Sequence, residues 1–191
     1  MNKALALLTI SLLALGIFGC TSAPVQNRSK DFPLTVLNSM FVPGILQSTG
    51  VDQASGGNAF LALKVRMENK GGSSASVVAS GFSVVIDSER YRCDFLKDTD
   101  NDPRFDGQDI GSVTISPKSY VEGWMIFEVP VSVKGINNGE LRFTDKALLG
   151  DGAYSKVTFA PSGAKRYDAI SARFTIEARS MIITYKYAGA D

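Results

Sequence analysis

Residues 60–68 read FLALKVRME, and this stretch decides the fold class. One side of the alternation carries Leu61, Leu63, Val65 and Met67, and the other carries Lys64, Arg66 and Glu68. Successive side chains of a β-strand point to opposite faces, so a period of two predicts a strand with one apolar and one polar face. Such a strand belongs to a sheet that packs one face on a core and leaves the other in water.

Further strand patterns lie on both sides of this stretch. Residues 82–86 alternate, and after a turn at 87–90 the alternation resumes at Tyr91, Cys93 and Phe95, which predicts a hairpin. Residues 124–129 (WMIFEV) are almost wholly apolar, as in a central strand covered on both sides, and Pro130 ends them. Shorter candidate strands occupy 113–115, 141–144, 154–160, 172–177 and 181–187. Because no stretch of ten residues after the N-terminal segment shows a helical stripe, the sequence predicts an all-β, immunoglobulin-like antiparallel β-sandwich.

The N-terminal segment predicts export. Lys3 precedes an apolar run at 4–18, which is shorter than the roughly 20 apolar residues of a membrane-spanning helix and typical of a signal peptide. Residues 17–20 (IFGC) resemble the lipoprotein box of bacteria and archaea, and the resemblance implies cleavage before Cys20 and lipidation of its thiol. The expected organisation is a signal peptide helix at 1–19, a lipid anchor and flexible tether at 20–31, and a sandwich domain at 32–191 with extra C-terminal strands from about 145. The expected location is the cell envelope, outside the cytoplasm and anchored to a membrane through Cys20.

Composition excludes several function classes. The chain has no histidine, which removes Ser-His-Asp and Cys-His catalysis and the commonest zinc ligand. Without Lys3 the remaining chain has 19 basic and 19 acidic side chains, so its charge predicts no nucleic-acid partner. Once Cys20 is set aside, Cys93 is alone and alternates with Tyr91 and Phe95, which favours a small buried residue over a reactive thiol.

Three segments carry a family resemblance: residues 60–70 (FLALKVRMENK), residues 82–87 (FSVVID) followed by Tyr91, and residues 121–130 (VEGWMIFEVP). Their order resembles the telokin-like, immunoprotective-extracellular-protein type of immunoglobulin-like domain, which is common in prokaryotic lipoproteins of unknown function. The resemblance covers about residues 34–144 and implies a fold, not a chemistry. It implies that Leu63 or Val65 faces Phe127 or one of its neighbours where an inter-sheet disulfide is usual.

Glycine and proline give the resemblance a physical basis. In residues 69–72 (NKGG), glycine allows the chain to reverse with positive φ. Gly123 leaves room where the chain enters the sheet, and Pro130 ends pairing because it has no N–H.

An acidic loop at residues 98–109 is the one candidate for metal chemistry. Counted from Asp98, carboxylates occur at positions 1, 3, 5, 9 and 12, namely Asp98, Asp100, Asp102, Asp106 and Asp109. Calcium binds six to eight oxygens, and this spacing is similar to that of a calcium loop. However, Pro103 stands where such a loop has glycine, and Asp109 stands where it has a longer glutamate. A solvated acidic loop that binds no metal explains the same residues, so both interpretations stay open.

These observations predict a protein that is not an enzyme. The leading hypothesis is an envelope lipoprotein whose sandwich is a binding or structural module for an envelope protein or a glycan, with no certain cofactor. The alternatives are a calcium-stabilised accessory or glycan-binding domain and, third, a hydrolase based on carboxylates alone. Trp124 could stack on a sugar, but its place in the most apolar strand favours core packing.

Overall fold

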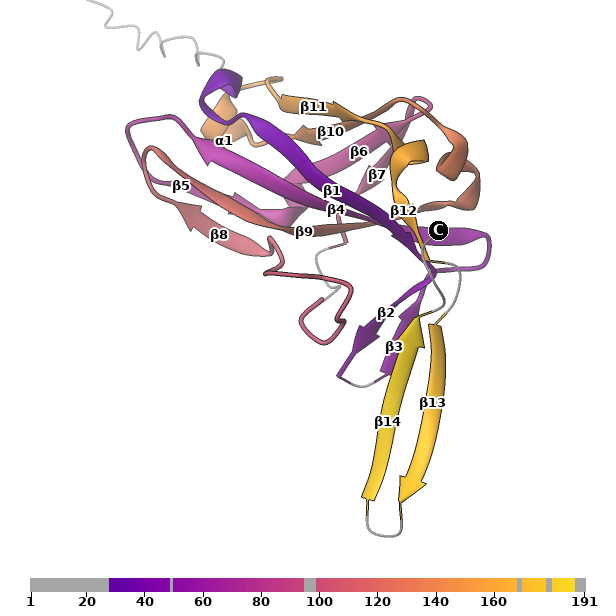
Figure 1. The fold of residues 1–191 in the computed structure, drawn as a ribbon. Coiled ribbons are helices and arrows are strands. Elements are labelled where there is room, and N and C mark those ends of the chain that lie inside the picture. The colour runs from indigo at the N-terminus through magenta and orange to yellow at the C-terminus, as the bar shows by residue number, and fades with distance from the viewer. Residues whose placement is uncertain (1–27, 49, 95–98, 168–169, 178–179, 188–191) are drawn as a thin grey trace, which may run out of the picture.

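Two four-stranded sheets face each other across one core (Figure 1). The computed structural model describes residues 28–48, 50–94, 99–167, 170–177 and 180–187; the predicted signal peptide and Cys20 lie outside them. The first sheet has the order β12-β1-β4-β9, with β1 at Leu34–Val42, β4 at Asn58–Asn69, β9 at Ser119–Pro130 and β12 at Lys165–Arg166. The second has the order β11-β10-β6-β7, with β6 at Phe82–Ile86, β7 at Glu89–Arg92, β10 at Gly139–Phe143 and β11 at Ser155–Phe159.

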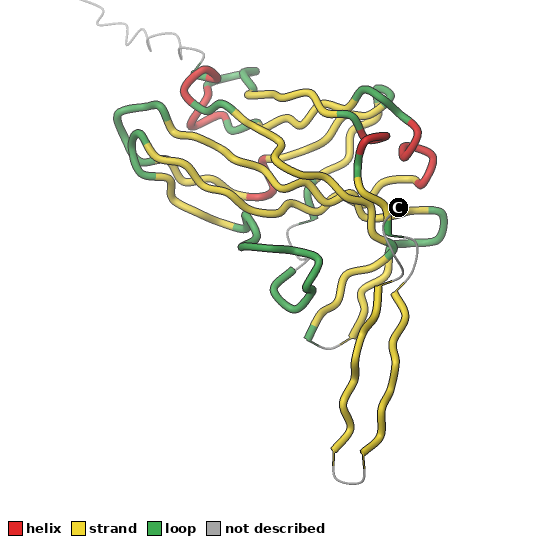
Figure 2. The backbone as a smooth tube through the Cα atoms, in the orientation of Figure 1, coloured by secondary structure: helices red, strands yellow, loops and turns green. Residues whose placement is uncertain are grey.

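Three two-stranded pairs complete the strands. They are β2 (Gly44–Gln47) with β3 (Gly50–Gln53), β5 (Ala75–Val78) with β8 (Ser112–Ile115), and β13 (Ile170–Glu177) with β14 (Ser180–Tyr187). The helices are η1 (Ser29–Asp31), η2 (Ala79–Gly81), η3 (Val131–Gly135), α1 (Lys146–Leu149) and η4 (Pro161–Gly163). Strands therefore dominate the described chain (Figure 2), and the all-β prediction is confirmed. The sheets are not purely antiparallel, because β12 runs parallel to β1.

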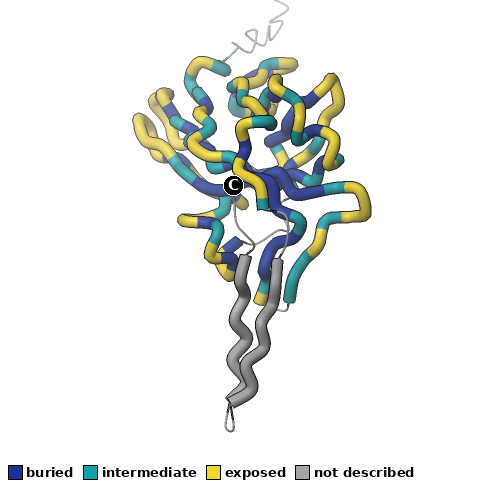
Figure 3. The backbone as a smooth tube through the Cα atoms, turned by 45° about the vertical axis from the view of Figure 1, so that its right-hand side comes forward, coloured by how far each residue is buried: buried dark blue, intermediate teal, exposed yellow. Residues whose placement is uncertain are grey.

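The core between the sheets is built by the alternation that the sequence predicts. Leu61, Leu63, Val65 and Met67 of β4 are fully buried in it. The second sheet contributes Phe82, Val84, Ile86, Leu141 and Phe143. Phe82 and Phe143 lie on neighbouring strands, and their rings pack at a tilt with centroids 4.7 Å apart. Buried residues accordingly concentrate inside the sandwich, and exposed ones line its loops (Figure 3).

The prediction that β4 faces Phe127 or its neighbours from the opposite sheet is wrong. β4 and β9 are hydrogen-bonded neighbours in one sheet, and the residue opposite Phe127 is Leu61. Leu63 and Val65 therefore do not meet Phe127 across the gap between two sheets. The backbone next to Phe127 on its other side is that of Cys93, a buried free thiol.

The β6–β7 hairpin is confirmed, and its turn has a clear cause. Asp87 and Ser88 have φ of 51° and 67°, and Ile86 pairs directly with Glu89. Two central residues with positive φ define the type I′ turn, whose twist matches that of the flanking strands. Phe95, which was expected to continue the second strand, lies outside the described residues.

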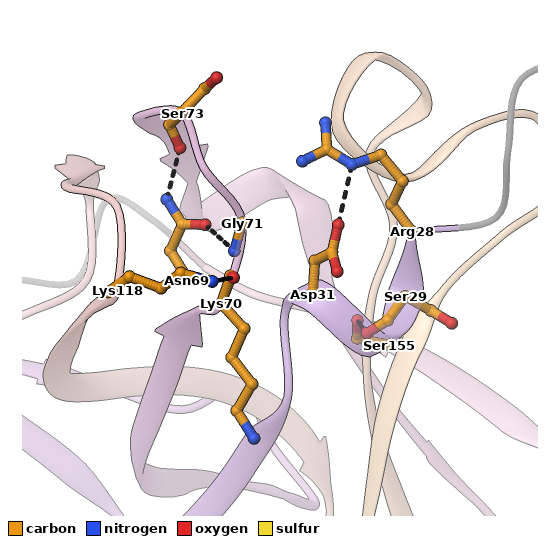
Figure 4. Close-up of polar contacts among 9 residues, drawn as sticks. All are labelled: Arg28, Ser29, Asp31, Asn69, Lys70, Gly71, Ser73, Lys118 and Ser155. Atoms are coloured by element: carbon orange, nitrogen blue, oxygen red, sulfur yellow. Dashed lines mark hydrogen bonds and ion pairs between the residues drawn. The ribbon is translucent and has the colours of Figure 1, made fainter.

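The turn after β4 forms, but not through positive φ at glycine. Neither Gly71 nor Gly72 has positive φ. Instead the buried Asn69 side chain holds the turn: its Nδ2 donates to the carbonyl oxygens of Ser73 (2.8 Å) and Ile115 (3.0 Å), and its Oδ1 accepts from the Gly71 N–H at 3.0 Å (Figure 4). A Cβ at Gly71 would lie 3.0 Å from Asn69 Oδ1, so a larger residue here would crowd the Asn69 side chain.

Strand β9 is covered on both faces, as predicted, but it is the last strand of its sheet. The outer edge of β9 is hydrogen-bonded to irregular segments of the chain. The N–H of Asp94 donates to Ile126 O at 2.8 Å, and that of Ile110 donates to Trp124 O at 3.1 Å. The approach at Gly123 is so close that a Cβ there would lie 2.5 Å from Gln108 O. The room predicted at Gly123 is therefore used by the end of the acidic loop.

The strands after residue 145 belong to three different sheets. β11 extends the second sheet beside β10, β12 adds to the first sheet beside β1, and β13 with β14 forms a hairpin that projects from the sandwich (Figure 1).

Candidate functional site

The outer face of the first sheet is divided into a covered half and an open half. In the covered half, β1, β4 and β9 present Met40, Val42, Phe60, Ala62, Trp124 and Ile126, which form a second core with Ile45 of β2 and Phe105 of the acidic loop. The prediction of one wet face is therefore wrong for half of the sheet. The cause is visible in the sequence of β4, where Phe60 and Ala62 precede Lys64 on the face that was expected to be polar.

Trp124 anchors the acidic loop to this second core. Its ring is buried and meets Phe105 edge to face, with ring centroids 5.1 Å apart, and its Nε1 donates to Asp106 O at 3.0 Å. The core interpretation of Trp124 is confirmed. A buried indole N–H needs an acceptor, and the loop backbone supplies it.

A buried ion pair fastens the same loop to the β2–β3 hairpin. The side chains of Asp102 and Arg104 are 0% and 2% exposed, and the guanidinium donates to both carboxylate oxygens. Asp102 also accepts the Leu46 N–H at 2.9 Å, and Arg104 donates to Gly44 O at 2.5 Å. Arg104 further lies 5.5 Å from the centre of the Tyr167 ring. The pair thus joins the loop, β2 and the segment that follows β12.

Burial alone would raise the pKa of Asp102. The hydrogen bonds from Arg104 and from the Leu46 N–H, with the positive charge of Arg104, outweigh it and hold the pKa below its usual range. Asp102 is therefore a charged group inside the protein whose charge is satisfied by this chain.

Two of the other predicted calcium ligands, Asp106 and Asp109, have partners of their own in this chain. Asp106 is 78% exposed and pairs with Lys64 Nζ at 2.8 Å, while Asp109 accepts the Thr99 N–H at 2.8 Å and the Thr99 hydroxyl. Asp100 is exposed, and Asp98 lies outside the described residues. Among the residues that the structure describes, no three acidic or thiol side chains gather closely enough to hold a metal ion. Calcium binding by the loop stays a prediction that needs its own test.

The open half of the outer face carries an exposed aromatic residue. Tyr120 of β9 is 57% exposed, and the Arg66 guanidinium of β4 lies 4.6 Å from the centre of its ring. Arg66 is directly opposite Glu122 and donates to its carboxylate, and this hydrogen bond is the main reason that the pKa of Arg66 is raised. Leu37, in the β-bulge of β1, adds an exposed apolar side chain to the same sheet. We call Arg66, Tyr120 and Glu122 the open-face cluster.

Sequence reasoning missed the residues that matter most here. Arg104 is the one basic residue inside a run of aspartates, which is a signal for an internal ion pair. Tyr120 gave no such signal, because its exposure depends on how far the acidic loop extends over the sheet.

The segment that enters the sandwich is firmly attached (Figure 4). The Arg28 N–H donates to Leu149 O at 3.1 Å, the Lys70 N–H donates to Asp31 O at 2.7 Å, and the Ser155 hydroxyl donates to Ser29 O at 2.9 Å. The Arg28 and Asp31 side chains form an ion pair of 3.0 Å. Any tether that precedes residue 28 therefore pulls on η1 and, through it, on both sheets.

The thiol of Cys93 is buried. Cys93 is 7% exposed, and burial raises the pKa of its thiol to about 12, so the thiol stays protonated at neutral pH.

No helix in the described part of the chain is long and apolar enough to cross a bilayer.

Comparison with known proteins places the chain among uncharacterised domains. A family model described as "Domain of unknown function (DUF4352)" matches residues 26–154. The candidate lipoprotein ycdA of Bacillus subtilis is 16% identical, with a TM-score of 0.48, over 73% of this chain and 39% of its own, so the chain spans less than half of that protein. The yjhA protein of Bacillus subtilis is 16% identical over 68% of this chain and 91% of its own, with a TM-score of 0.45. An uncharacterised β-sandwich protein of Clostridium difficile is 17% identical over 67% of this chain and 85% of its own, with a TM-score of 0.37. No curated protein sequence matches the chain.

Proposed function

The chain belongs to the DUF4352 family of domains of unknown function, and we propose that it is a non-catalytic binding module of the cell envelope. Its place outside the cytoplasm and its membrane anchor at Cys20 are part of the proposal and rest on the N-terminal sequence. The telokin-like, immunoglobulin-like classification is likewise a proposal, which rests on residues 60–70, 82–91 and 121–130 and agrees with a two-sheet sandwich.

The observation that carries the binding role is the open-face cluster. Tyrosine and arginine are the side chains that most often dominate the binding energy of protein interfaces. Here Arg66 is held between Glu122 and the Tyr120 ring, so both side chains have lost part of their freedom before any partner arrives. Such preorganisation lowers the entropic cost of binding.

The cluster favours a protein partner over a glycan. It is a surface of mixed character, in which the exposed Tyr120 ring supplies apolar area and the ion pair of Arg66 with Glu122 supplies polar groups. Stacking on one tyrosine ring supplies few of the hydrogen bonds that fix the orientation of a sugar in its site. A glycan therefore remains the alternative outcome of the test.

The test is photo-crosslinking on intact cells, with a photoreactive residue at position 120. The matched control is position 154. Tyr154 is also exposed and also has an arginine, Arg142, 4.9 Å from its ring, but it directly precedes β11 of the second sheet. We expect a discrete protein adduct from position 120, its loss on Arg66→Ala, and no such adduct from position 154. Adducts to polysaccharide would support the glycan alternative, and equal labelling from both positions would contradict the proposal.

The anchor has a separate test. Cys20→Ala should remove the lipid-modified terminus found by mass spectrometry of membrane fractions and release the chain from the membrane. A wild-type chain that carries no added mass and starts at another residue would contradict the lipoprotein assignment.

A further inference from the structure

The outer face of the second sheet gathers basic side chains. Val84 and Leu141 are fully buried in the core between the sheets, so the residues on either side of them along β6 and β10 point away from the core. Two rows of opposed residues cross this outer face, namely Arg92-Ser83-Arg142-Lys156 and Arg90-Val85-Glu140-Thr158. The two rows therefore hold four basic side chains and one acidic side chain.

The one acidic side chain of this face is already shared by two of the cations. Arg142 donates to one carboxylate oxygen of Glu140, and Lys156 Nζ lies 2.8 Å from the other. Arg90 and Arg92 of β7 and Lys156 of β11 are exposed to solvent. Four positive charges against one negative charge leave the face with a net charge of three positive.

The opposite outer face of the sandwich has the other sign. The outward positions of β4 and β9 hold two basic side chains, Lys64 and Arg66, and three acidic ones, Glu68, Glu122 and Glu128. The acidic loop adds further carboxylates on that side of the molecule. A chain whose sequence is almost neutral therefore folds into a domain with one basic face, because the strand order sorts the charges.

The segment that would carry the tether enters beside the basic face. Ser155, the first residue of β11, donates its hydroxyl to Ser29 O of η1 at 2.9 Å, and η1 lies at the same end of the molecule as the start of β11 (Figure 1). If Cys20 is the anchor, as proposed above, residues 20–28 span at most roughly 30 Å. The tether then keeps the β11 edge of the second sheet close to the bilayer.

We propose that the basic outer face of the second sheet lies against anionic lipid headgroups of the bilayer that holds the anchor. Each basic side chain near an anionic surface strengthens the attraction by about fivefold, whereas the acidic opposite face is repelled. Tyr154 is 38% exposed beside Arg142, and tyrosine is enriched at the level of the headgroups. This orientation rests on the proposed anchor at Cys20, and it directs the open-face cluster away from the membrane, toward a protein partner.

The test measures which face of the whole chain approaches the lipid. The chain is purified from cells and reconstituted into vesicles of phosphatidylcholine, alone or with about 30% phosphatidylglycerol, that carry nitroxide-labelled headgroups. A fluorophore is attached at Thr158→Cys on the basic face or, as the matched control, at Asn38→Cys opposite Lys64 in the first sheet; both positions are exposed. Cys93 is buried and should not be labelled.

We expect headgroup quenching at position 158 that exceeds quenching at position 38 several-fold in anionic vesicles, and no difference between the two positions in neutral vesicles. Arg90→Gln combined with Arg92→Gln removes two of the four cations and should shift the bound fraction about 30-fold toward detachment. The control Lys165→Gln with Arg166→Gln removes two exposed charges from β12 and should leave the quenching unchanged. About 0.5 M NaCl should abolish the difference between the positions, because it screens charges beyond a few ångströms.

Three results would overturn the proposal: equal quenching at both positions in anionic vesicles, quenching at position 158 that is the same in neutral and anionic vesicles, or no quenching at position 158. Flotation with neutral vesicles judges the anchor separately, because a lipid-modified chain floats whatever its orientation. A chain that floats with neutral vesicles but shows no preference for position 158 would contradict the membrane-facing sheet alone. A chain that fails to float with neutral vesicles, yet is quenched at position 158 in anionic ones, would contradict the anchor and support the basic face.

Discussion

Replacing Asp102 tests whether the acidic loop is held by the buried ion pair. Asp102→Ala leaves the Arg104 guanidinium, which is 2% exposed, without its carboxylate. Removing one partner of a buried pair costs about 3–5 kcal/mol, because the remaining charge is desolvated and uncompensated. For a domain of this size, 1 kcal/mol corresponds to about 2–4 °C in melting temperature, so the expected loss is roughly 6–20 °C.

The assay is equilibrium urea unfolding followed by two probes. Trp124 is the only tryptophan and lies in the second core, so its fluorescence reports on the covered half of the first sheet. Far-ultraviolet circular dichroism reports on both sheets. The control is Asp106→Ala in the same loop, because the Asp106 carboxylate is 78% exposed and its pair with Lys64 should contribute less than about 1 kcal/mol.

A double-mutant cycle isolates the interaction of Asp102 with Arg104 from their interactions with other residues. Asp102→Ala combined with Arg104→Met should cost less than Asp102→Ala alone, because no buried charge remains. If Asp102→Ala costs no more than Asp106→Ala by the Trp124 probe, the pair does not hold the loop and this reasoning is refuted.

The same pair sets a pH dependence. The pKa of Asp102 is lower in the folded than in the unfolded protein, so the folded state binds fewer protons and gains stability above the unfolded pKa of about 3.9. That stability is lost as pH falls from about 4 through the folded pKa. The unfolding free energy of the wild type should therefore drop more steeply below pH 4 than that of Asp102→Asn, and parallel profiles would contradict the assignment.

Three more predictions concern the core, the close approach at β9 and the acidic loop. Gly123→Ala should cost about 1–3 kcal/mol in urea unfolding, because the new Cβ would lie 2.5 Å from Gln108 O, whereas Gly111→Ala, with open space around its Cβ, should be close to neutral. Phe127→Ala should cost about 3–5 kcal/mol by the same measurement, and a neutral effect would place that ring outside the core. Because Asp102, Asp106 and Asp109 already have partners in this chain, about 10 mM Ca²⁺ should leave the melting temperature at its value in EDTA. A calcium-dependent rise that Asp100→Ala abolishes would instead support the calcium hypothesis.

Local pattern was sufficient for the most regular strands. The alternation at residues 60–68 and 82–86 identifies β4 and β6, because a half-buried strand selects apolar side chains at every second position. The cause of one turn was predicted incorrectly. The chain reverses after Asn69 as expected, but through the Asn69 side chain, whose acceptor at Ile115 is distant in sequence.

The acidic loop shows that spacing alone does not identify the partners of its carboxylates. Five aspartates at intervals typical of a calcium loop suggested a shared centre, yet three of them turn to different partners: Arg104, Lys64 and Thr99. Only Arg104 is a neighbour in sequence with an obvious opposite charge. The partner of Asp106 comes from β4, and the sequence carries no sign that these residues meet.

The sequence by itself determined the all-β class and the apolar faces of the main core, because each depends on the order of residue types along a short segment. The tertiary structure decided which strands are neighbours, which half of the outer face is covered, and that Tyr120 is exposed beside Arg66. These features depend on contacts between distant segments, such as Phe105 on Trp124 and Asp102 on Leu46. A local pattern can require that a side chain be buried or paired, but only the folded chain specifies the partner that does it.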